Sequence, residues 1–406
     1  MTLSELRDSI APVVADFDRR RVLVLGDAIL DEYLLGDCSR ISPEAPVPVL
    51  RVSRARRVLG GAANTAANIV SLGGCATLVA LVGQDEGGRT LVDCARQAGV
   101  DLRAIDHGRA TLRKTRVVSQ QQQIVRLDYE EIHPATPAVE AAILSAVDEG
   151  IGACDVVVIS DYAKGFLSPA LAHAIVERAH RAGLPIVADP RPQNKSCYAG
   201  CDYLTPNWRE ARALLNLPDA EPVAGNVASV ARALAHALAT NVVLTLGPHG
   251  ILFCSADAAE MFSLPTLARE VFDVSGAGDT VVAAFALARA AGADHRTAVT
   301  LANKAASVVV GKFGTATVTA AEMLEETNTA RLVSRQALAP LAATLRAADC
   351  VVLLVNHQSL DLDYIRRCAP RLVDACNAIP CIPTSDVSVD TVVPSARKEG
   401  EHCVSF

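Results

Sequence analysis

Short, mostly apolar runs alternate along the chain with longer segments whose apolar positions recur at helical spacing. The clearest apolar runs are residues 22–25, 77–82, 155–159, 186–188 and 242–246. The helical segments between them are residues 86–98, 169–182, 207–215 and 226–239. A strand that is apolar throughout is buried on both faces, so this alternation predicts an α/β fold with a mostly parallel sheet between two layers of helices. Ligands of such sheets bind beyond the carboxyl ends of the strands.

Two stretches break this rhythm, because apolar and polar residues alternate singly in residues 46–57 and 112–128. Single alternation predicts antiparallel strands with one packed face and one face in water. We therefore expect a small β lid, set apart from the main sheet, with strands within residues 33–57 and 107–130. Strands of this kind bury little surface by themselves, so we expect them to cover a cleft or to pair with a second copy in a homodimer.

The chain changes character after residue 326. A polar break is followed by a predicted helix at 336–347, a strand at 350–355 and a second helix at 360–368. Five of the twelve cysteines lie beyond residue 349. We therefore divide the chain into a main domain, 1–326, and a short α/β appendage, 327–406. The last residues, about 25 of them, are rich in proline, serine and charge and are expected to be loosely ordered.

Composition narrows the function classes. Half of the residues are hydrophobic and only 4% are aromatic, so the core must consist mainly of aliphatic side chains, as in α/β proteins. The net charge of −7 provides no overall basic field, so neither nucleic acid nor a membrane is an expected partner. The first residues lack an apolar signal sequence and the cysteines form no Cys-x-x-Cys pair, which predicts a cytoplasmic protein with reduced thiols.

The sequence Asp273-Val-Ser-Gly-Ala-Gly-Asp279 directly precedes a long apolar helical segment. Glycines that open a helix leave backbone N–H groups unpaired, and the helix dipole adds partial positive charge. Gly276, Ala277 and Gly278 are therefore candidates for an anion hole. An aspartate beside a bound anion can deprotonate a hydroxyl nucleophile, which makes Asp279 a candidate general base for phosphoryl transfer. The alternative is a glycine-rich turn in which Asp279 is an ordinary first-turn residue.

With these residues the chain resembles the ribokinase-like (PfkB) family of carbohydrate kinases. Residues 273–279 are similar to the family's C-terminal Asp-Thr-x-Gly-Ala-Gly-Asp signature, with Val274 and Ser275 as variations. Gly60-Gly61-Ala-Ala-Asn64 resembles its N-terminal glycine turn, and Asn207-Trp-Arg-Glu210 resembles its Asn-x-x-Glu motif. The resemblance implies a ribokinase-like three-layer α/β sandwich with a small β-strand lid. It also implies ATP and Mg²⁺ as ligands and leaves a monovalent cation open.

A narrower resemblance is to the heptose-7-phosphate kinase branch of this family. It rests on the stretches at 26–31, 40–48, 122–128, 160–165 and 311–317. It implies phosphorylation of O1 of D-glycero-β-D-manno-heptose 7-phosphate, on the way to the ADP-heptose of the lipopolysaccharide core. One loop departs from this branch, because Asp189-Pro-Arg-Pro-Gln-Asn-Lys195 stands where much of the branch has Asp-Pro-Lys-Gly. The exact sugar phosphate therefore stays open.

The resemblance assigns roles to several sets of residues. Contacts with sugar hydroxyls are assigned to Asp27, Asp31, Gly60, Gly61 and Asn64, and a substrate phosphate to Arg40, Lys114, Arg116 and Arg126. Further substrate candidates are Asp161 and Lys164, which follow a buried strand. ATP contacts are assigned to Asn207, Glu210, Thr245, Gly247 and Asn303, with Glu210 also supporting the magnesium ion. Plain structural alternatives are turns and caps for the aspartates, a solvated strand face for the cations, and a polar helix position for Asn303.

Two rival functions stay open from the sequence. A kinase of this family can act on another sugar or sugar phosphate, and a catalytically silent regulator can bind sugar or nucleotide without turnover. The tail lacks the His-x-Gly-His motif of the adenylyltransferase domain fused to many heptose kinases, so that second activity is not expected. Residues 348–357 and 371–378 weakly resemble the end of nucleotide-sugar dehydrogenases, without their Gly-x-Gly-x-x-Gly turn, and His357 is interpreted as a loop residue.

Overall fold

The chain divides into two units, Met1–Glu325 and Glu326–Phe406. The computed structural model describes residues 3–119, 122–268 and 271–325 of the first unit and 351–353, 372–374 and 389–390 of the second. The two units are described separately below.

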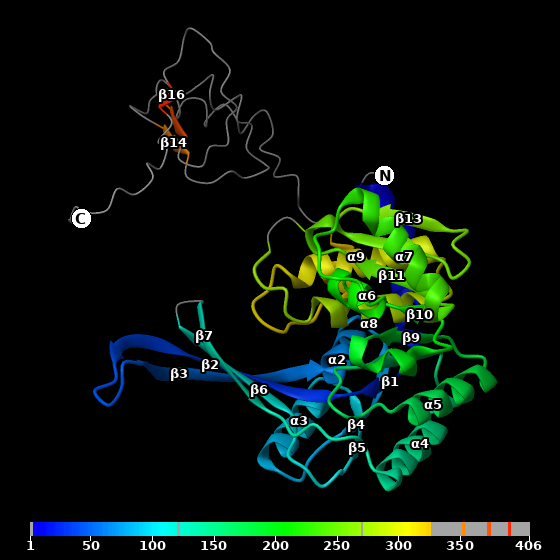
Figure 1. Cartoon of the computed structure of the whole chain (residues 1–406), viewed down its shortest axis with the longest axis horizontal. Helices are drawn as coiled ribbons and strands as arrows, with labels where there is room; N and C mark the ends of the chain where they lie inside the picture. Colours follow the sequence, from blue (N-terminus) through cyan, green and yellow to red (C-terminus); the bar gives the residue numbers. More distant parts are fainter. Residues whose placement is uncertain are drawn as a thin grey trace. The chain divides into compact units, whose positions relative to one another are not determined.

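A nine-stranded sheet forms the centre of the first unit (Figure 1). Its strand order is β13-β12-β11-β10-β9-β8-β1-β4-β5. Neighbouring strands are parallel from β5 to β11, and β12 and β13 complete the other edge as antiparallel strands. The strands are β1 (Arg21–Gly26), β4 (Cys75–Leu81), β5 (Asp101–Ile105), β8 (Val156–Ser160), β9 (Ile186–Asp189), β10 (Tyr203–Leu204), β11 (Asn241–Thr245), β12 (Ile251–Cys254) and β13 (Met261–Leu264).

Helices cover both faces of this sheet (Figure 1). One layer contains α1 (Leu3–Ala15), α2 (Ala62–Ser71), α3 (Glu86–Gln97), α8 (Ala277–Ala290), α9 (His295–Val309) and α10 (Ala320–Leu324). The other contains α4 (Pro137–Ile151), α5 (Pro169–Arg181), α6 (Trp208–Leu214) and α7 (Ala224–Leu238). Strand β1 is buried on both sides, with Val22 and Val24 in the first core and Leu23 and Leu25 in the second. None of the described helices has the length and apolar character needed to cross a membrane.

This architecture confirms the predicted three-layer α/β sandwich. Each of the five apolar runs lies in a strand of the central sheet, apart from at most one residue at an end, and the four helical segments correspond to α3, α5, α6 and α7. Local capping explains where the helices begin. At α5, for example, the Ser168 side chain accepts the Leu171 N–H and Pro169 occupies the first helical position.

A second, four-stranded sheet projects from the body of the first unit as the lid (Figure 1). Its order is β3-β2-β6-β7, with β2 (Ala28–Ile41), β3 (Pro48–Gly61), β6 (Arg113–Ser119) and β7 (Gln122–Tyr129). The β2–β3 and β6–β7 pairs are antiparallel as predicted, whereas β2 and β6 run parallel. Strand β2 is buried at its base and becomes exposed toward its outer end.

A single residue, Asp27, separates the central strand β1 from the lid strand β2, because β1 ends at Gly26 and β2 begins at Ala28. Strands β1 and β8 approach so closely there that a Cβ on Gly26 would lie 1.9 Å from the Ser160 carbonyl oxygen. The absence of a Cβ at Gly26 permits this approach. It brings Asp27 against the loop that follows β8.

In the second unit, the described residues form three short parallel strands in the order β14-β15-β16. They are β14 (Val351–Leu353), β15 (Leu372–Asp374) and β16 (Val389–Asp390). Strand β14 lies inside the predicted strand at 350–355. The predicted helices at 336–347 and 360–368, His357 and the predicted loosely ordered end lie outside the described residues.

Candidate active site

Polar side chains gather where the parallel strands of the central sheet end. Asp27 follows β1, Asp161 follows β8, and Asp189 is the last residue of β9. Helix α8 begins at the same place, because the Tyr162 hydroxyl of the loop after β8 contacts Asp279 in its first turn. The carboxyl ends of parallel strands share one edge of the sheet, so residues far apart in the chain meet there.

The first turn of α8, which holds the predicted anion-hole residues, begins after a left-handed glycine. Gly276 is left-handed, with a φ of 78°, and a Cβ on it would lie 2.7 Å from Nδ2 of Asn64. The Gly278 N–H, in the first turn, has no intrahelical acceptor. The Ala277 N–H instead donates to the Val274 carbonyl oxygen at 3.2 Å. Of the three predicted anion-hole residues, Ala277 thus has its N–H group already bonded within the turn.

Asp273 shapes this turn. Its Oδ1 accepts the Ser275 N–H at 2.8 Å, which holds the chain just before Gly276. Its Oδ2 accepts the Gly314 N–H at 3.0 Å, which ties the turn to the loop after α9. The two aspartates of the motif thus differ in their surroundings, because Asp273 binds backbone and Asp279 faces side chains.

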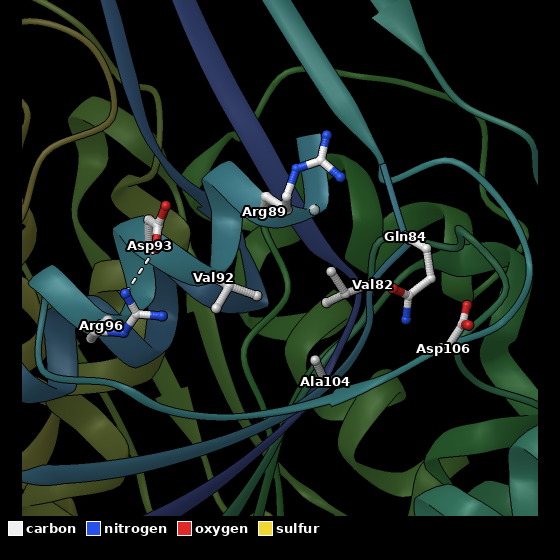
Figure 2. Close-up of a pocket in the computed structure, with 10 residues that line it drawn as sticks. Val82, Gln84, Arg89, Val92, Asp93, Arg96, Ala104 and Asp106 are labelled. Carbon is white, nitrogen blue, oxygen red and sulfur yellow. Dashed lines mark hydrogen bonds and ion pairs between the residues drawn. The ribbon is translucent and has the colours of Figure 1, made fainter. Parts of the chain in front are cut away.

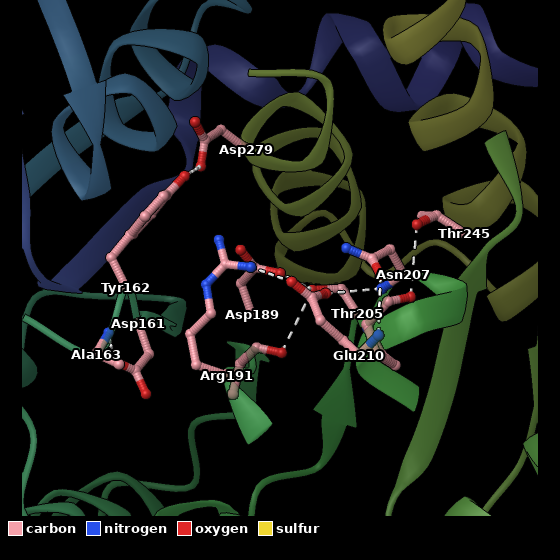
Figure 3. A network of polar contacts seen from close by, with 12 residues as sticks. Asp161, Tyr162, Ala163, Asp189, Arg191, Thr205, Asn207, Glu210, Thr245 and Asp279 are labelled. Atoms are coloured by element: carbon pink, nitrogen blue, oxygen red, sulfur yellow. Dashed lines mark hydrogen bonds and ion pairs between the residues drawn. The ribbon is translucent and has the colours of Figure 1, made fainter. Parts of the chain in front are cut away.

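The Asp279 carboxylate is 3% exposed and accepts three side-chain hydrogen bonds. Asn64 Nδ2 donates to Oδ2 at 2.7 Å, and Thr65 Oγ1 donates to Oδ1 at 3.2 Å. The Tyr162 hydroxyl donates to Oδ1 at 2.6 Å (Figure 3). Burial raises the pKa of Asp279, and the three hydrogen bonds oppose that rise because they favour the ionised form. The site therefore holds an oriented carboxylate that can accept a proton.

Asp27 lies beneath the loop that follows β8. Its carboxylate accepts the N–H groups of Tyr162 and Lys164 at 3.0 Å and of Phe166 at 3.2 Å. Burial raises the pKa of Asp27 to about 6, although these N–H groups favour the charged form. The bonds support the turn-forming alternative for Asp27. The three N–H groups occupy three of the four lone pairs of the carboxylate, so only one is left to accept a hydrogen bond from a sugar hydroxyl, the predicted partner.

Asp161 is held in the same way within its own loop. Its carboxylate accepts the Ala163 N–H at 2.7 Å, the Asn194 side-chain N–H at 2.7 Å and the Tyr198 hydroxyl at 2.5 Å. These bonds favour the turn alternative for Asp161 over direct substrate contact. The acidic residue binds the β8 loop to the short 3₁₀ helix Pro192–Tyr198.

Asp31, Gly60 and Arg116 meet at the base of the lid. Arg116 forms an ion pair with Asp31 at 2.5 Å, and Thr315 Oγ1 donates to Asp31 Oδ2 at 3.1 Å. A Cβ on Gly60 would lie 2.4 Å from Asp31 Oδ2, and one on Gly61, whose φ is 59°, would meet the Asp27 backbone at 2.4 Å. Both positions of the predicted turn therefore require glycine, because β3 passes close to the Asp31 side chain and to the Asp27 backbone.

The predicted phosphate-binding cations separate into two groups. Lys114 Nζ lies 5.7 Å from the centre of the Tyr162 ring, and Lys164 pairs with Glu130 at 2.6 Å. Together with Arg116, these lysines reach the edge of the site. Arg126 lies opposite Arg116 on β7 and near enough to Lys114 to lower the pKa of that lysine, although its side chain is half exposed and pairs with Asp128. Arg40 is exposed at the outer end of β2.

Asn207 and Glu210 form a capping box at the start of α6. Asn207 Oδ1 accepts the Glu210 N–H at 3.0 Å, and Glu210 Oε2 accepts the Asn207 N–H at 2.9 Å. The Glu210 carboxylate also forms an ion pair with Arg191 (Figure 3). Thr245 lies beside Asn207 through a parallel bridge at the end of β11. The structure thus brings three of the residues predicted to contact ATP together.

The two other predicted ATP residues lie on neighbouring loops and helices. Gly247 follows β11 with a φ of 57°, and Asn303 on α9 donates to the Pro265 carbonyl oxygen at 2.7 Å. Magnesium prefers oxygen ligands and usually takes only one or two carboxylates from a protein. Glu210 supplies such a carboxylate. Within the described ranges, no group of three or more His, Cys, Asp or Glu residues could hold a metal by itself.

Several residues of this network were not predicted, among them Thr65, Tyr162, Asp189 and Arg191. The Arg191 guanidinium carbon lies 4.8 Å from the centre of the Tyr162 ring, so Arg191 stands between the Asp279 and Glu210 sides of the site (Figure 3). Burial and the nearby Glu210 charge raise the pKa of Asp189 well above its usual range. Signals for three of these residues were present, since Tyr162 lies in the 160–165 stretch and Asp189 and Arg191 in the divergent loop.

Two pockets of the first unit differ in their relation to these residues. A pocket of about 290 Å³ is lined by Asn64 and Thr315 together with Arg56 and Arg57 of β3, so it borders the base of the lid. A pocket of about 400 Å³ beside α3 is lined by Arg89, Arg96 and Asp106, among others, and contains none of the predicted site residues (Figure 2). The smaller pocket is therefore the one that adjoins the candidate site.

Known proteins resemble this chain over most of its length. Residues 19–322 match the model of the pfkB family carbohydrate kinases. The bifunctional protein HldE of Gluconacetobacter diazotrophicus is 41% identical over 384 residues, which covers 89% of this chain and 78% of that protein. The bifunctional protein HldE of Azorhizobium caulinodans is 40% identical, covering 85% of this chain and 74% of its own length.

Solved structures share the fold. Phosphofructokinase-2 from Escherichia coli in complex with potassium aligns with a TM-score of 0.64 and 21% identity, over 75% of this chain and 96% of that chain. The ribokinase of Thermotoga maritima aligns with a TM-score of 0.58 and 21% identity, over 76% of this chain and 99% of its own. At this identity the likeness concerns the fold.

The raised pKa of Asp27, about 6, predicts a specific pH dependence of stability. Between the ordinary aspartate pKa and this value the unfolded chain loses the proton first, so the contribution of Asp27 to the free energy of unfolding falls as pH rises through that window. Asp27→Asn removes the titration. We expect the free energy of unfolding of the wild type, relative to Asp27→Asn, to fall by about 2 kcal/mol between roughly pH 4.5 and pH 7. Urea unfolding at several pH values measures this, and a constant difference would contradict it.

Proposed function

Because the chain belongs to the pfkB family of carbohydrate kinases, we propose that it transfers the γ-phosphoryl group of ATP to O1 of D-glycero-β-D-manno-heptose 7-phosphate. The enzyme is a phosphotransferase that acts on a sugar hydroxyl. The choice of this heptose phosphate is supported by the stretches at 26–31, 160–165 and 311–317 and by relatives named bifunctional protein HldE. We infer that the reaction takes place in the cytoplasm.

One observation carries this proposal: Asp279 is a buried, oriented carboxylate directly beside a glycine turn at a helix start. A base and an anion-binding turn in contact are what phosphoryl transfer to a hydroxyl requires, because the reaction depends mainly on positioning and charge stabilisation. The same pairing has no use in a protein that only binds sugar or nucleotide. The silent-regulator alternative is therefore disfavoured.

The nucleotide is expected on the side of the site formed by Asn207, Glu210, Thr245, Gly247 and Asn303. Glu210 would hold the magnesium ion, which when bound neutralises charge on the phosphates. Arg191 already pairs with Glu210, so this cation lies where phosphate charge would be received. Arg191 is also the residue that replaces the lysine common in the heptose branch, and arginine preserves the positive charge there.

In the transfer step, the first turn of α8 supplies both the base and the backbone N–H groups. The acceptor hydroxyl gives its proton to the Asp279 carboxylate while its oxygen forms a bond to the γ-phosphorus. The bond from that phosphorus to the bridging oxygen breaks, and ADP leaves. The backbone N–H groups at Gly276 and Gly278 stabilise the charge on the phosphoryl oxygens during the transfer.

The acceptor's own phosphate group needs cations on the sugar side of the site. Lys114, Arg116 and Lys164 supply them at the base of the lid. Burial lowers the pKa of Lys114, which is the expected effect of withdrawing an ammonium group from water before an anion arrives. Arg116 and Lys164 are paired with Asp31 and Glu130, so Lys114 is the cation that chiefly favours a phosphorylated sugar over a free one.

A coupled ADP-release assay tests the substrate. With heptose 7-phosphate we expect kcat/KM to exceed the values for fructose 6-phosphate, glucose 6-phosphate and free hexoses by at least about 100-fold, because a site built from polar contacts rejects acceptors that leave those groups unpaired. ATP without acceptor is the control for background hydrolysis. A hexose phosphate used equally well would point to another sugar, and ATP binding without turnover on any acceptor would point to a regulator.

We further propose that two copies of the chain pair through the lid. All eight residues of β7 are exposed, and Val125, Leu127 and Tyr129 on it are 45%, 41% and 47% exposed. An apolar strand at the edge of a sheet is rarely left open to solvent, because its unpaired backbone and side chains invite association.

Sedimentation velocity tests this pairing. The chain is expected to sediment as a dimer, at about twice its mass of 42.6 kDa. Introducing charge with Val125→Glu and Leu127→Glu should shift it to the monomer. Leu217→Glu, at a similarly exposed leucine in the loop after α6, should leave the dimer intact. A wild-type chain that stays monomeric at all concentrations used would refute the pairing.

A further inference from the structure

Tyr162 makes the closest contact with the candidate base. Its hydroxyl lies 2.6 Å from Asp279 Oδ1, compared with 2.7 Å and 3.2 Å for the donors Asn64 and Thr65. Burial and the Asp279 charge raise the pKa of Tyr162 well above its usual range, so the phenol stays protonated and can donate. The ring is flanked by Arg191, whose guanidinium carbon lies 4.8 Å from its centre (Figure 3).

Two buried aspartates hold the backbone from which Tyr162 projects. Asp27 accepts the N–H groups of Tyr162 and Lys164, and Asp161 accepts that of Ala163 between them. Ala163 is left-handed, with a φ of 54°, a conformation that disfavours residues other than glycine. Several contacts therefore hold this loop in an unfavourable backbone conformation, as is typical of segments that position a functional side chain.

The hydrogen bonds at Asp279 divide its two oxygens. Oδ1 accepts two donors, Tyr162 and Thr65, whereas Oδ2 accepts only Asn64. A carboxylate oxygen offers two lone-pair directions, so Oδ1 is filled and Oδ2 has one direction free. We propose that Tyr162 is a positioning residue for the phosphoryl transfer: it occupies Oδ1, so that Oδ2 is the atom that receives the proton of the acceptor hydroxyl. This inference rests on the proposed function, since it assigns atoms within that reaction.

The effect of the Tyr162 hydroxyl on the pKa of Asp279 can be separated from the effects of the nearby charges. Arg191, which follows β9, lowers the pKa of Asp279. Asp189 at the end of β9 and Asp279 repel each other, and α2 contributes only the neutral donors Asn64 and Thr65. Loss of the Tyr162 hydroxyl alone removes a donor that favours the ionised base and changes no formal charge. The pKa of Asp279 must then rise.

The test is Tyr162→Phe, which keeps the ring against Arg191 and removes only the hydroxyl. In pH profiles of kcat/KM with ATP and the best acceptor, the acid limb should move to higher pH. On that limb kcat/KM should fall by about tenfold, since a hydrogen bond to a charged group is lost, and the neutral plateau should change less. The matched control is Tyr203→Phe, a buried tyrosine that packs on Phe285 of α8 and bonds His295, and its acid limb should coincide with that of the wild type.

NMR titration of the chain with ¹³Cγ-labelled aspartate measures the pKa of Asp279 without requiring turnover. The Asp279 signal is assigned by its loss in Asp279→Asn, and its pKa should rise in Tyr162→Phe but not in Tyr203→Phe. An unchanged Asp279 pKa and acid limb in Tyr162→Phe would overturn the proposal, as would a gain in activity, which would mean that the tyrosine blocks the base. A wild-type chain that phosphorylates no sugar would refute the proposed function instead and would leave the aspartate titration to decide this inference.

Discussion

A buried carboxylate on which three hydrogen-bond donors converge is the feature on which the architecture of the first unit depends. Burying a charge without partners is costly, so Asp279 is tolerable only where several donors converge on it. Those donors come from α2 and from the loop after β8, while Asp279 itself starts α8. The three segments are far apart in the chain, and the parallel sheet brings them together at one edge.

Two glycines and Arg191 connect the segments that form this site. Gly276 lets α8 start against Asn64, and Gly60 lets β3 pass Asp31 at the base of the lid. Arg191 then joins the two sides, since it stacks on Tyr162 and pairs with Glu210. One cation is thus in contact with the segment that orients the base and with the carboxylate expected to support the metal.

The sequence predicted the sandwich well because the spacing of apolar residues reflects which side chains are buried. The strands and most of the helices can be predicted from that spacing. Roles could also be proposed for Asp279 and the glycine turn, since that motif consists of neighbours in the chain. Other features depend on contacts between distant segments. The three N–H groups that occupy Asp27, the approach of Tyr162 to Asp279 and the Arg191–Glu210 pair have no local signature. For the same reason, the sequence could not show that Arg126 lies opposite Arg116, whereas Arg40 is exposed at the outer end of β2.

The rate of phosphoryl transfer by Asp279→Asn in a single turnover is the most direct test of this account. Asparagine preserves the size of the side chain and accepts hydrogen bonds, but it cannot take the proton of the acceptor hydroxyl. The rate with ATP and heptose 7-phosphate should fall on the order of 100- to 10,000-fold, with ATP affinity unchanged. Asp257→Asn, at an exposed residue of the turn between β12 and β13, should match the wild type. A near-normal rate for Asp279→Asn would contradict the account.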